Sequence, residues 1–112
     1  MRFKELTEFD FLPTLAASTG VSIVMFSGPD CGSCRRLEEL LPYLLRDRAQ
    51  YLYKVDVQRS TALARAYEVF HLPSLFAFLD GHYHGPLQAE PTLAGFSHAL
   101  NTLLSGPPQE EP

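Results

Sequence analysis

The two cysteines of this chain, Cys31 and Cys34, are separated by only Gly32 and Ser33. Two thiols at this spacing in a turn can close a small disulfide ring or open to a dithiol, which is the chemistry of a reversible two-electron switch. An apolar stretch precedes the pair and an amphipathic stretch follows it. The sequence therefore predicts that the cysteines lie where a buried strand turns into a helix.

The position at the start of a helix predicts unequal roles for the two thiols. Free N–H groups and the positive end of the helix dipole stabilise a thiolate, and at such sites the cysteine pKa falls from about 8.5 to roughly 3.5–7.5. Cys31, nearer the helix end, is expected to be the nucleophile, and Cys34 is expected to attack the mixed disulfide that results. Asp30, a candidate helix cap, opposes thiolate formation, whereas Arg35 and Arg36 offset it.

Histidines and zinc provide alternative interpretations of the same region. Cysteine pairs also bind zinc, and His82 and His84 lie on one face of an expected strand. We interpret these histidines as solvated edge residues, so no metal site is predicted. His71, two residues before Pro73, is a candidate for proton exchange with the dithiol because of its near-neutral pKa, or is an ordinary loop histidine.

Strands and helices alternate along the chain and must position this pair. The apolar residues at 21–26 predict a central strand covered on both faces. Asp80-Gly81 predicts a tight hairpin and thus an antiparallel last strand. The fold class is α/β, with a central mixed sheet and helices on both faces. The expected order, β-α-β-α-β-α-β-β-α, corresponds to residues 2–6, 11–18, 21–26, 31–47, 51–57, 60–67, 74–79, 82–84 and 92–105.

The length and composition limit the function. The 112 residues, 46% hydrophobic and 20% charged, form one domain at 1–105, and 106–112 is expected to be a disordered tail. Nine basic against thirteen acidic residues and no basic run make nucleic acid an unsuitable partner. No apolar run reaches the roughly 18 residues of a membrane span, and the N-terminus lacks a secretion signal. A cytoplasmic monomer is expected, unless a leader has been removed.

Six short motifs occur in order along the chain: Val24-Met25-Phe26, Cys31-Gly32-Ser33-Cys34, Val55-Asp56, Tyr67-Glu68-Val69, Leu72-Pro73-Ser74 and Phe78-Leu79-Asp80-Gly81. In these motifs the chain resembles the thioredoxin-like superfamily, up to about residue 105. The resemblance implies a thioredoxin fold in which Pro73 follows a cis peptide and faces the dithiol. It also implies that Leu72 and Pro73 form the shelf on which an extended substrate segment docks.

The chain also departs from that family. Asp30 stands where thioredoxins usually carry tryptophan, and the chain has no tryptophan at all. The family often pairs a buried acid with a lysine to move the proton of the second cysteine. We place those two positions at Met25 and Leu52, both apolar. The fold is expected to tolerate this replacement, whereas turnover is expected to be slower.

Two functions are consistent with these residues. The first is a thiol-disulfide oxidoreductase that acts on protein disulfides. It would need no bound cofactor, since no Gly-x-Gly-x-x-Gly motif occurs, and would take electrons from a separate reductase or small thiol. The second is a thioredoxin-fold binding or chaperone module, because residues 69–73 and 81–85 resemble parts of thioredoxin-like hydrogenase-maturation proteins. The missing tryptophan, buried acid and lysine favour the second function, whereas the intact cysteine pair favours the first.

Overall fold

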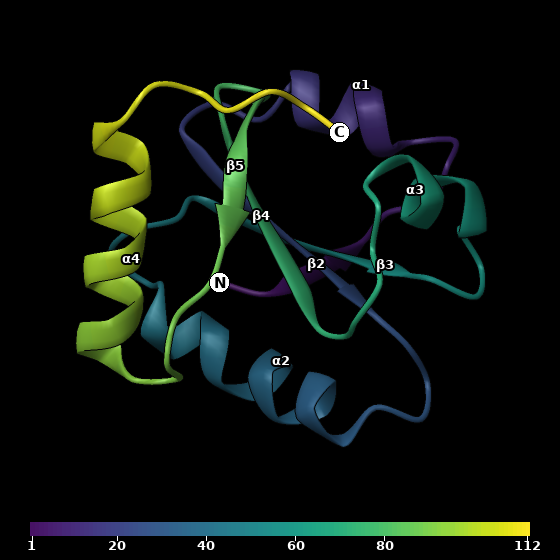
Figure 1. Ribbon diagram of the computed structural model, residues 1–112, viewed down its shortest axis with the longest axis horizontal. Coiled ribbons are helices and arrows are strands. Elements are labelled where there is room, and N and C mark those ends of the chain that lie inside the picture. Colours follow the sequence, from purple (N-terminus) through teal and green to yellow (C-terminus); the bar gives the residue numbers. More distant parts are fainter.

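The computed structural model describes residues 1–112 and contains one five-stranded sheet with four helices (Figure 1). The strands lie in the order β1-β3-β2-β4-β5. The predicted order of elements is confirmed. The elements are β1 (Phe3–Glu5), α1 (Phe11–Ala16), β2 (Val21–Ser27), α2 (Gly32–Leu44), β3 (Tyr51–Asp56), α3 (Thr61–Ala66), β4 (Ser74–Leu79), β5 (His82–Leu87) and α4 (Leu93–Ser105).

The sheet is mixed, and β2 lies at its centre. β1, β3 and β2 are parallel, whereas β4 runs antiparallel to β2 and β5 antiparallel to β4. Because β2 has a strand on each side and helices on both faces, all of its residues except the last are buried. The prediction of a central strand at this position is therefore confirmed.

Helices cover both faces of the sheet and bury two separate apolar clusters (Figure 1). One cluster contains Leu41 of α2 and Phe96 of α4, and the other contains Phe11 of α1 with Tyr67, which follows α3. Period-3.6 spacing of apolar residues in the helices supplies these inward faces. None of the helices is long and apolar enough to cross a membrane.

The turn between β4 and β5 has the backbone that its sequence predicts. Asp80 and Gly81 have φ angles of +51° and +83°, and a type I′ hairpin turn needs positive φ at both central residues. The Asp80 carboxylate accepts the N–H of Gly20 at 2.7 Å, which ties the hairpin to the start of β2. A Cβ at Gly81 would lie 2.6 Å from the carbonyl oxygen of Leu15, so this position requires glycine.

The C-terminal segment 106–112 forms neither helix nor strand, as its composition suggests. It does not extend freely from the domain, however. Gln109 donates its backbone N–H to the carbonyl oxygen of His84 in β5 at 2.8 Å. The sequence prediction of a tail with nothing to bury did not anticipate this contact.

Candidate active site at the start of α2

The cysteine pair caps the N-terminus of α2. Cys31 and Cys34 form a disulfide, with their Cα atoms 5.2 Å apart. Cys31 is the N-cap residue, and its Sγ accepts the backbone N–H of Cys34 at 3.1 Å. Cys34 is 2% exposed, whereas Cys31 is partly exposed. A sulfur that accepts a first-turn N–H is placed where the helix stabilises negative charge.

The loop before β4 lies against the turn that carries the cysteines. Ser74, the first residue of β4, is paired with Phe26 near the end of β2, so the preceding loop reaches the β2–α2 turn. A Cβ at Gly28 in that turn would lie 3.0 Å from Cδ1 of Leu72. The Leu72–Pro73 peptide bond is cis, as the resemblance implies. The sheet register thus brings Leu72 and Pro73 to the dithiol turn.

Asp30 does not have the capping role proposed for it. It is exposed and stands one residue before the true cap, which is Cys31. Cys31 is the N-cap because the first helical residue of α2 is Gly32. Sequence preferences favour aspartate over cysteine as a cap, which explains the wrong assignment.

Two arginines place positive charge over the dithiol turn. The Nη1 group of Arg35 donates to the carbonyl oxygen of Pro29 at 3.3 Å. A Cβ at Gly32 would lie 3.6 Å from a guanidinium nitrogen of Arg36 and 4.0 Å from one of Arg35. Both cations therefore lie near Gly32, the first residue of α2, where they favour a thiolate.

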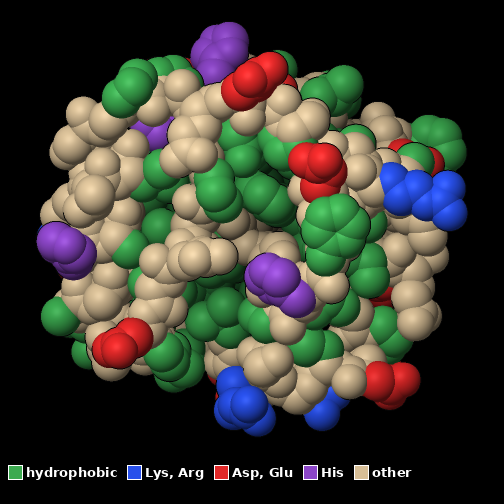
Figure 2. Space-filling view, viewed as in Figure 1, with side chains coloured by type: hydrophobic (Ala, Val, Ile, Leu, Met, Phe, Trp, Pro, Cys, Tyr) green, Lys and Arg blue, Asp and Glu red, His purple; other side chains and the backbone are tan.

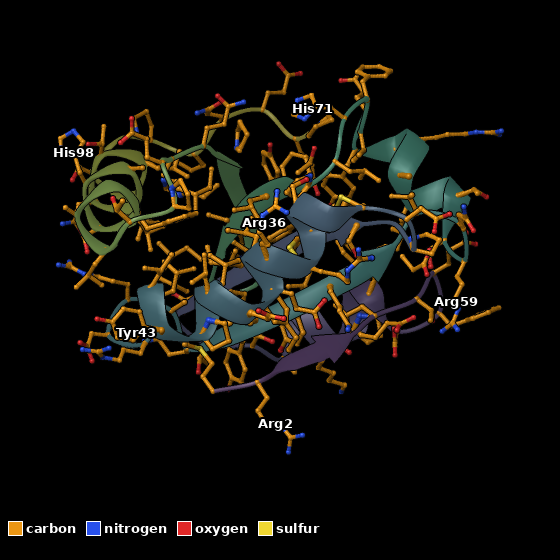
Figure 3. The ribbon with its side chains drawn as sticks, turned by 90° about the horizontal axis from the view of Figure 1, so that it is seen from below. Arg2, Arg36, Tyr43, Arg59, His71 and His98 are labelled. Atoms are coloured by element: carbon orange, nitrogen blue, oxygen red, sulfur yellow. A yellow bond between two sulfur atoms is a disulfide. The ribbon has the colours of Figure 1, made fainter.

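A cavity of about 880 Å³ opens beside this turn. Figure 2 shows apolar side chains gathered in a hollow between α4 and α3. Ser33 and Arg36 of α2 line the cavity, together with Phe70, His71 and Pro73 from the loop before β4. Arg36 and His71 thus reach it from two separate elements (Figure 3). The structure brings His71 to the same cavity as the residue between the cysteines.

Phe70 is a feature of this cavity that the sequence reasoning missed. Its side chain is 89% exposed, although phenylalanine is usually buried. It directly precedes His71 in a loop. The signal in the sequence was a large apolar residue close to Leu72 and Pro73, the candidate docking shelf. An exposed ring at the mouth of a cavity is suited to contact an apolar partner segment.

The position assigned to the family's lysine needs correction. Leu52 pairs with Ile23, whereas Lys54 is the residue opposite Met25. The assignment was two residues out because the register between β2 and β3 cannot be read from either strand alone. The residue of β2 at this position is methionine rather than an acid, and Met25 is fully buried.

Lys54 forms an ion pair that the sequence reasoning did not find. Its Nζ lies 2.8 Å from the Glu38 carboxylate, and both side chains are about one-third exposed, at 30% and 36%. Glu38 follows Cys34 by four residues on α2, a spacing that puts the two side chains on the same helix face. The i, i+4 relation of thiol and carboxylate was the signal in the sequence.

The two histidines of β5 have different environments. His82 is exposed, as expected, but His84 is only 5% exposed, so its interpretation as a solvated edge residue is wrong. The register shift between Phe78 and Ala77 leaves His84 unpaired in a bulge. Its Nε2 lies 2.9 Å from the carbonyl oxygen of Leu103 at the end of α4. Bulges redirect side chains in this way, and strict alternation does not foresee them.

Together these features define a class of protein, an α/β domain in which a redox-capable cysteine pair caps a helix opposite a cis-proline loop. Residues 2–102 match the family model described as Thioredoxin. The chain is 33% identical over 84 residues to the thioredoxin of Staphylococcus aureus strain Mu50, which covers 72% of this chain and 78% of that protein. The chain belongs to the thioredoxin family and is a thiol-disulfide oxidoreductase.

Solved structures agree on the fold. A point-mutant thioredoxin from Halobacterium salinarum NRC-1 superposes with a TM-score of 0.72 at 23% identity, covering 99% of this chain and 95% of that one. The reduced Schistosoma mansoni thioredoxin pre-protein superposes with a TM-score of 0.75 at 22% identity, covering 92% and 99%. The predicted thioredoxin fold is confirmed. The family match and the cysteine pair do not favour the alternative, a binding or chaperone module with little redox turnover.

Proposed function

We propose that the protein reduces disulfides of protein substrates, with Cys31 as the nucleophile and Cys34 as the resolving thiol. The observation that carries this assignment is the unequal placement of the two sulfurs. Cys31 Sγ is the partly exposed one and accepts a helix N–H, whereas Cys34 is buried behind it. A substrate therefore reaches Cys31 first, and the helix stabilises its thiolate.

The reaction transfers two electrons from the dithiol to the substrate. The Cys31 thiolate attacks one substrate sulfur, so a mixed disulfide forms and one substrate thiolate leaves. Cys34, deprotonated, then attacks the sulfur of Cys31, and the second substrate thiolate leaves and takes up a proton. The product is the Cys31–Cys34 disulfide, which is the state of the pair in this structure. A separate reductase or a small thiol returns the two electrons.

Docking of the substrate is assigned to Leu72 and Pro73, together with the cavity beside them. Leu72 packs against the turn that carries the cysteines, so a segment lying on this loop places its disulfide next to Cys31. Asp30, Arg35 and His71 are candidate modulators. Asp30 and Arg35 flank the cysteine pair in sequence, and His71 lines the adjoining cavity. We place the protein in the cytoplasm, and we infer a monomer because one domain holds the whole site.

Reduction of insulin with dithiothreitol as electron source tests this function. Wild type is expected to accelerate precipitation of the insulin B chain, and Cys31→Ser is expected to abolish the acceleration. Cys34→Ser should instead accumulate a mixed disulfide with the substrate, because the first attack proceeds and the second cannot. Equal rates for wild type and Cys31→Ser would disprove the proposal. Equal trapping by the two single variants would disprove the assigned roles.

A further inference from the structure

The C-terminal tail, residues 106–112, crosses β5 after α4 ends (Figure 1). Its Gln109 donates a backbone N–H to the carbonyl oxygen of His84 at 2.8 Å. β5 is the last strand of the sheet, so this bond adds a backbone partner to an edge strand. Edge strands readily bind extended segments in this way, and here the segment belongs to the chain itself.

The side chain of His84 fixes the point where the tail departs. Its Nε2 lies 2.9 Å from the carbonyl oxygen of Leu103 and 3.1 Å from that of Gly106. Both partners are acceptors, so Nε2 carries the proton and donates to them. His84 therefore binds the end of α4 through its ring and the tail through its backbone carbonyl group.

Gly85 leaves the space that the tail needs. A Cβ at this position would lie 2.8 Å from Cδ1 of Leu103 and 3.0 Å from Nε2 of Gln109. Real Cβ contacts are seldom this short, so the ends of the Leu103 and Gln109 side chains would have to shift to admit a larger residue. The absence of a side chain at Gly85 thus lets the Gln109 side chain lie against the edge strand.

The far end of the tail is held by a buried tyrosine. Tyr67 is 7% exposed and lies in an aromatic cluster. It donates its hydroxyl to the Glu111 carboxylate. Burial, together with this carboxylate, raises the pKa of Tyr67, and the same two causes raise that of Tyr83. The hydroxyl groups therefore stay protonated, and Tyr67 remains a donor to the tail.

The tail and the dithiol turn line the same cavity. Gln109, Glu110 and Pro112 form part of its wall, and Ser33 and Arg36 of α2 form another part. The acidic end of the tail thus shares this space with the guanidinium of Arg36 and with the docking loop at Pro73. A substrate segment that follows this cavity toward Cys31 meets the tail.

We propose that residues 106–112 are a built-in ligand of this cavity, an extended acidic strap that competes with the substrate segment for the surface beside the dithiol. His84, Gly85 and Tyr67 form its seat. The competition rests on the proposed function, because it requires that a protein substrate docks near Pro73. The seat itself does not depend on any activity.

Full-length variants test the strap. Glu111→Ala removes the acceptor of the Tyr67 hydroxyl, and Gln109→Pro removes the N–H that binds His84. Asp47→Ala is the matched control, since it removes the same charge from an exposed acid whose only ion pair is with Arg46. The measurements are amide hydrogen exchange at Gln109 by NMR, for wild type, Glu111→Ala and the control, and the kcat and KM for insulin. Turnover of a small aromatic disulfide, which needs no groove, is the third measurement.

Release of the strap should speed exchange at Gln109 and lower the KM for insulin, each by about fivefold, the equivalent of one net hydrogen bond. Turnover of the small disulfide should stay within about twofold of wild type. Equal exchange in wild type and Glu111→Ala would overturn the seat. Faster exchange with an unchanged KM would overturn the competition. A wild type that leaves insulin intact would reject the proposed function, and exchange at Gln109 would still decide whether the tail is seated.

Discussion

Replacing the two arginines over the dithiol turn should slow the reaction of Cys31. In the reduced protein the thiolate is the reactive form, and the nearby cations favour it over the neutral thiol. Arg36→Gln therefore lowers the fraction of thiolate at neutral pH, and Arg35→Gln does the same. Both side chains are exposed, so water screens the effect strongly.

The size of the effect follows from the geometry. The guanidinium nitrogens approach within 3.6 and 4.0 Å of the Cβ position of Gly32, the residue after Cys31. Taking about 6 Å to the Cys31 sulfur and the dielectric constant of water, each charge contributes about 0.7 kcal/mol. That energy corresponds to roughly a threefold change in the acid dissociation constant of Cys31 for one arginine and roughly tenfold for both, and the thiolate fraction changes by the same factor at a pH well below the pKa.

Alkylation by iodoacetamide, followed on the Cys34→Ser background, measures this fraction directly. At low salt and at a pH below the pKa of the thiol, the rate should fall about threefold in either single variant and about tenfold in the double variant. In about 1 M salt, where the screening length is only about 3 Å, the difference should nearly vanish. Arg46→Gln is the control, because Arg46 lies beyond the other end of α2, about 20 Å away along a helix rise of about 1.5 Å per residue. A double variant that reacts at the wild-type rate in low salt would refute the electrostatic reasoning.

Three further outcomes are expected. Glu38→Gln should slow release of the substrate from the mixed disulfide by about 100-fold, the lower end of the range for acid–base assistance, while the neighbouring Glu39→Gln changes it less than about twofold; equal effects would exclude a role for Glu38. Gly81→Ala should destabilise the fold by about 2–4 kcal/mol in urea unfolding, because its φ is +83° and its Cβ would meet the Leu15 backbone, whereas a Cβ at Gly106 would make only ordinary van der Waals contacts, so Gly106→Ala should be near neutral. The pKa of Tyr67 is raised on folding, so its contribution to the free energy of unfolding should be fully present below the unfolded pKa of about 10 and should decline as the pH rises above that value. Tyr67→Phe should flatten this decline in unfolding curves measured across that pH range.

Much of the fold could be predicted because its signals are local. The apolar run of β2, the helical spacing of apolar residues and the Asp80-Gly81 turn each act within a few residues. The cysteine pair could be placed at a strand-to-helix turn for the same reason. The proximity of Leu72 and Pro73 to that turn came from family resemblance, and in the structure it follows from the pairing of Ser74 with Phe26.

Other features depended on contacts between distant segments. Cys31 is the helix cap because α2 begins at Gly32. Lys54 lies opposite Met25 because of the register between β2 and β3. His84 is buried because of a bulge in β5 and the end of α4. The tail binds to an edge strand whose residues we had expected to face solvent.

The amino-acid sequence by itself determined the order of strands and helices, the position of the thiols and the two-electron chemistry available to them. Those properties depend on residue type and short-range periodicity, which a single segment carries in full. Only the tertiary structure decided which charges face the thiols, which histidine is buried and what covers the sheet edge. Such relations depend on strand register and on the packing of segments far apart in the chain, and no local pattern records them.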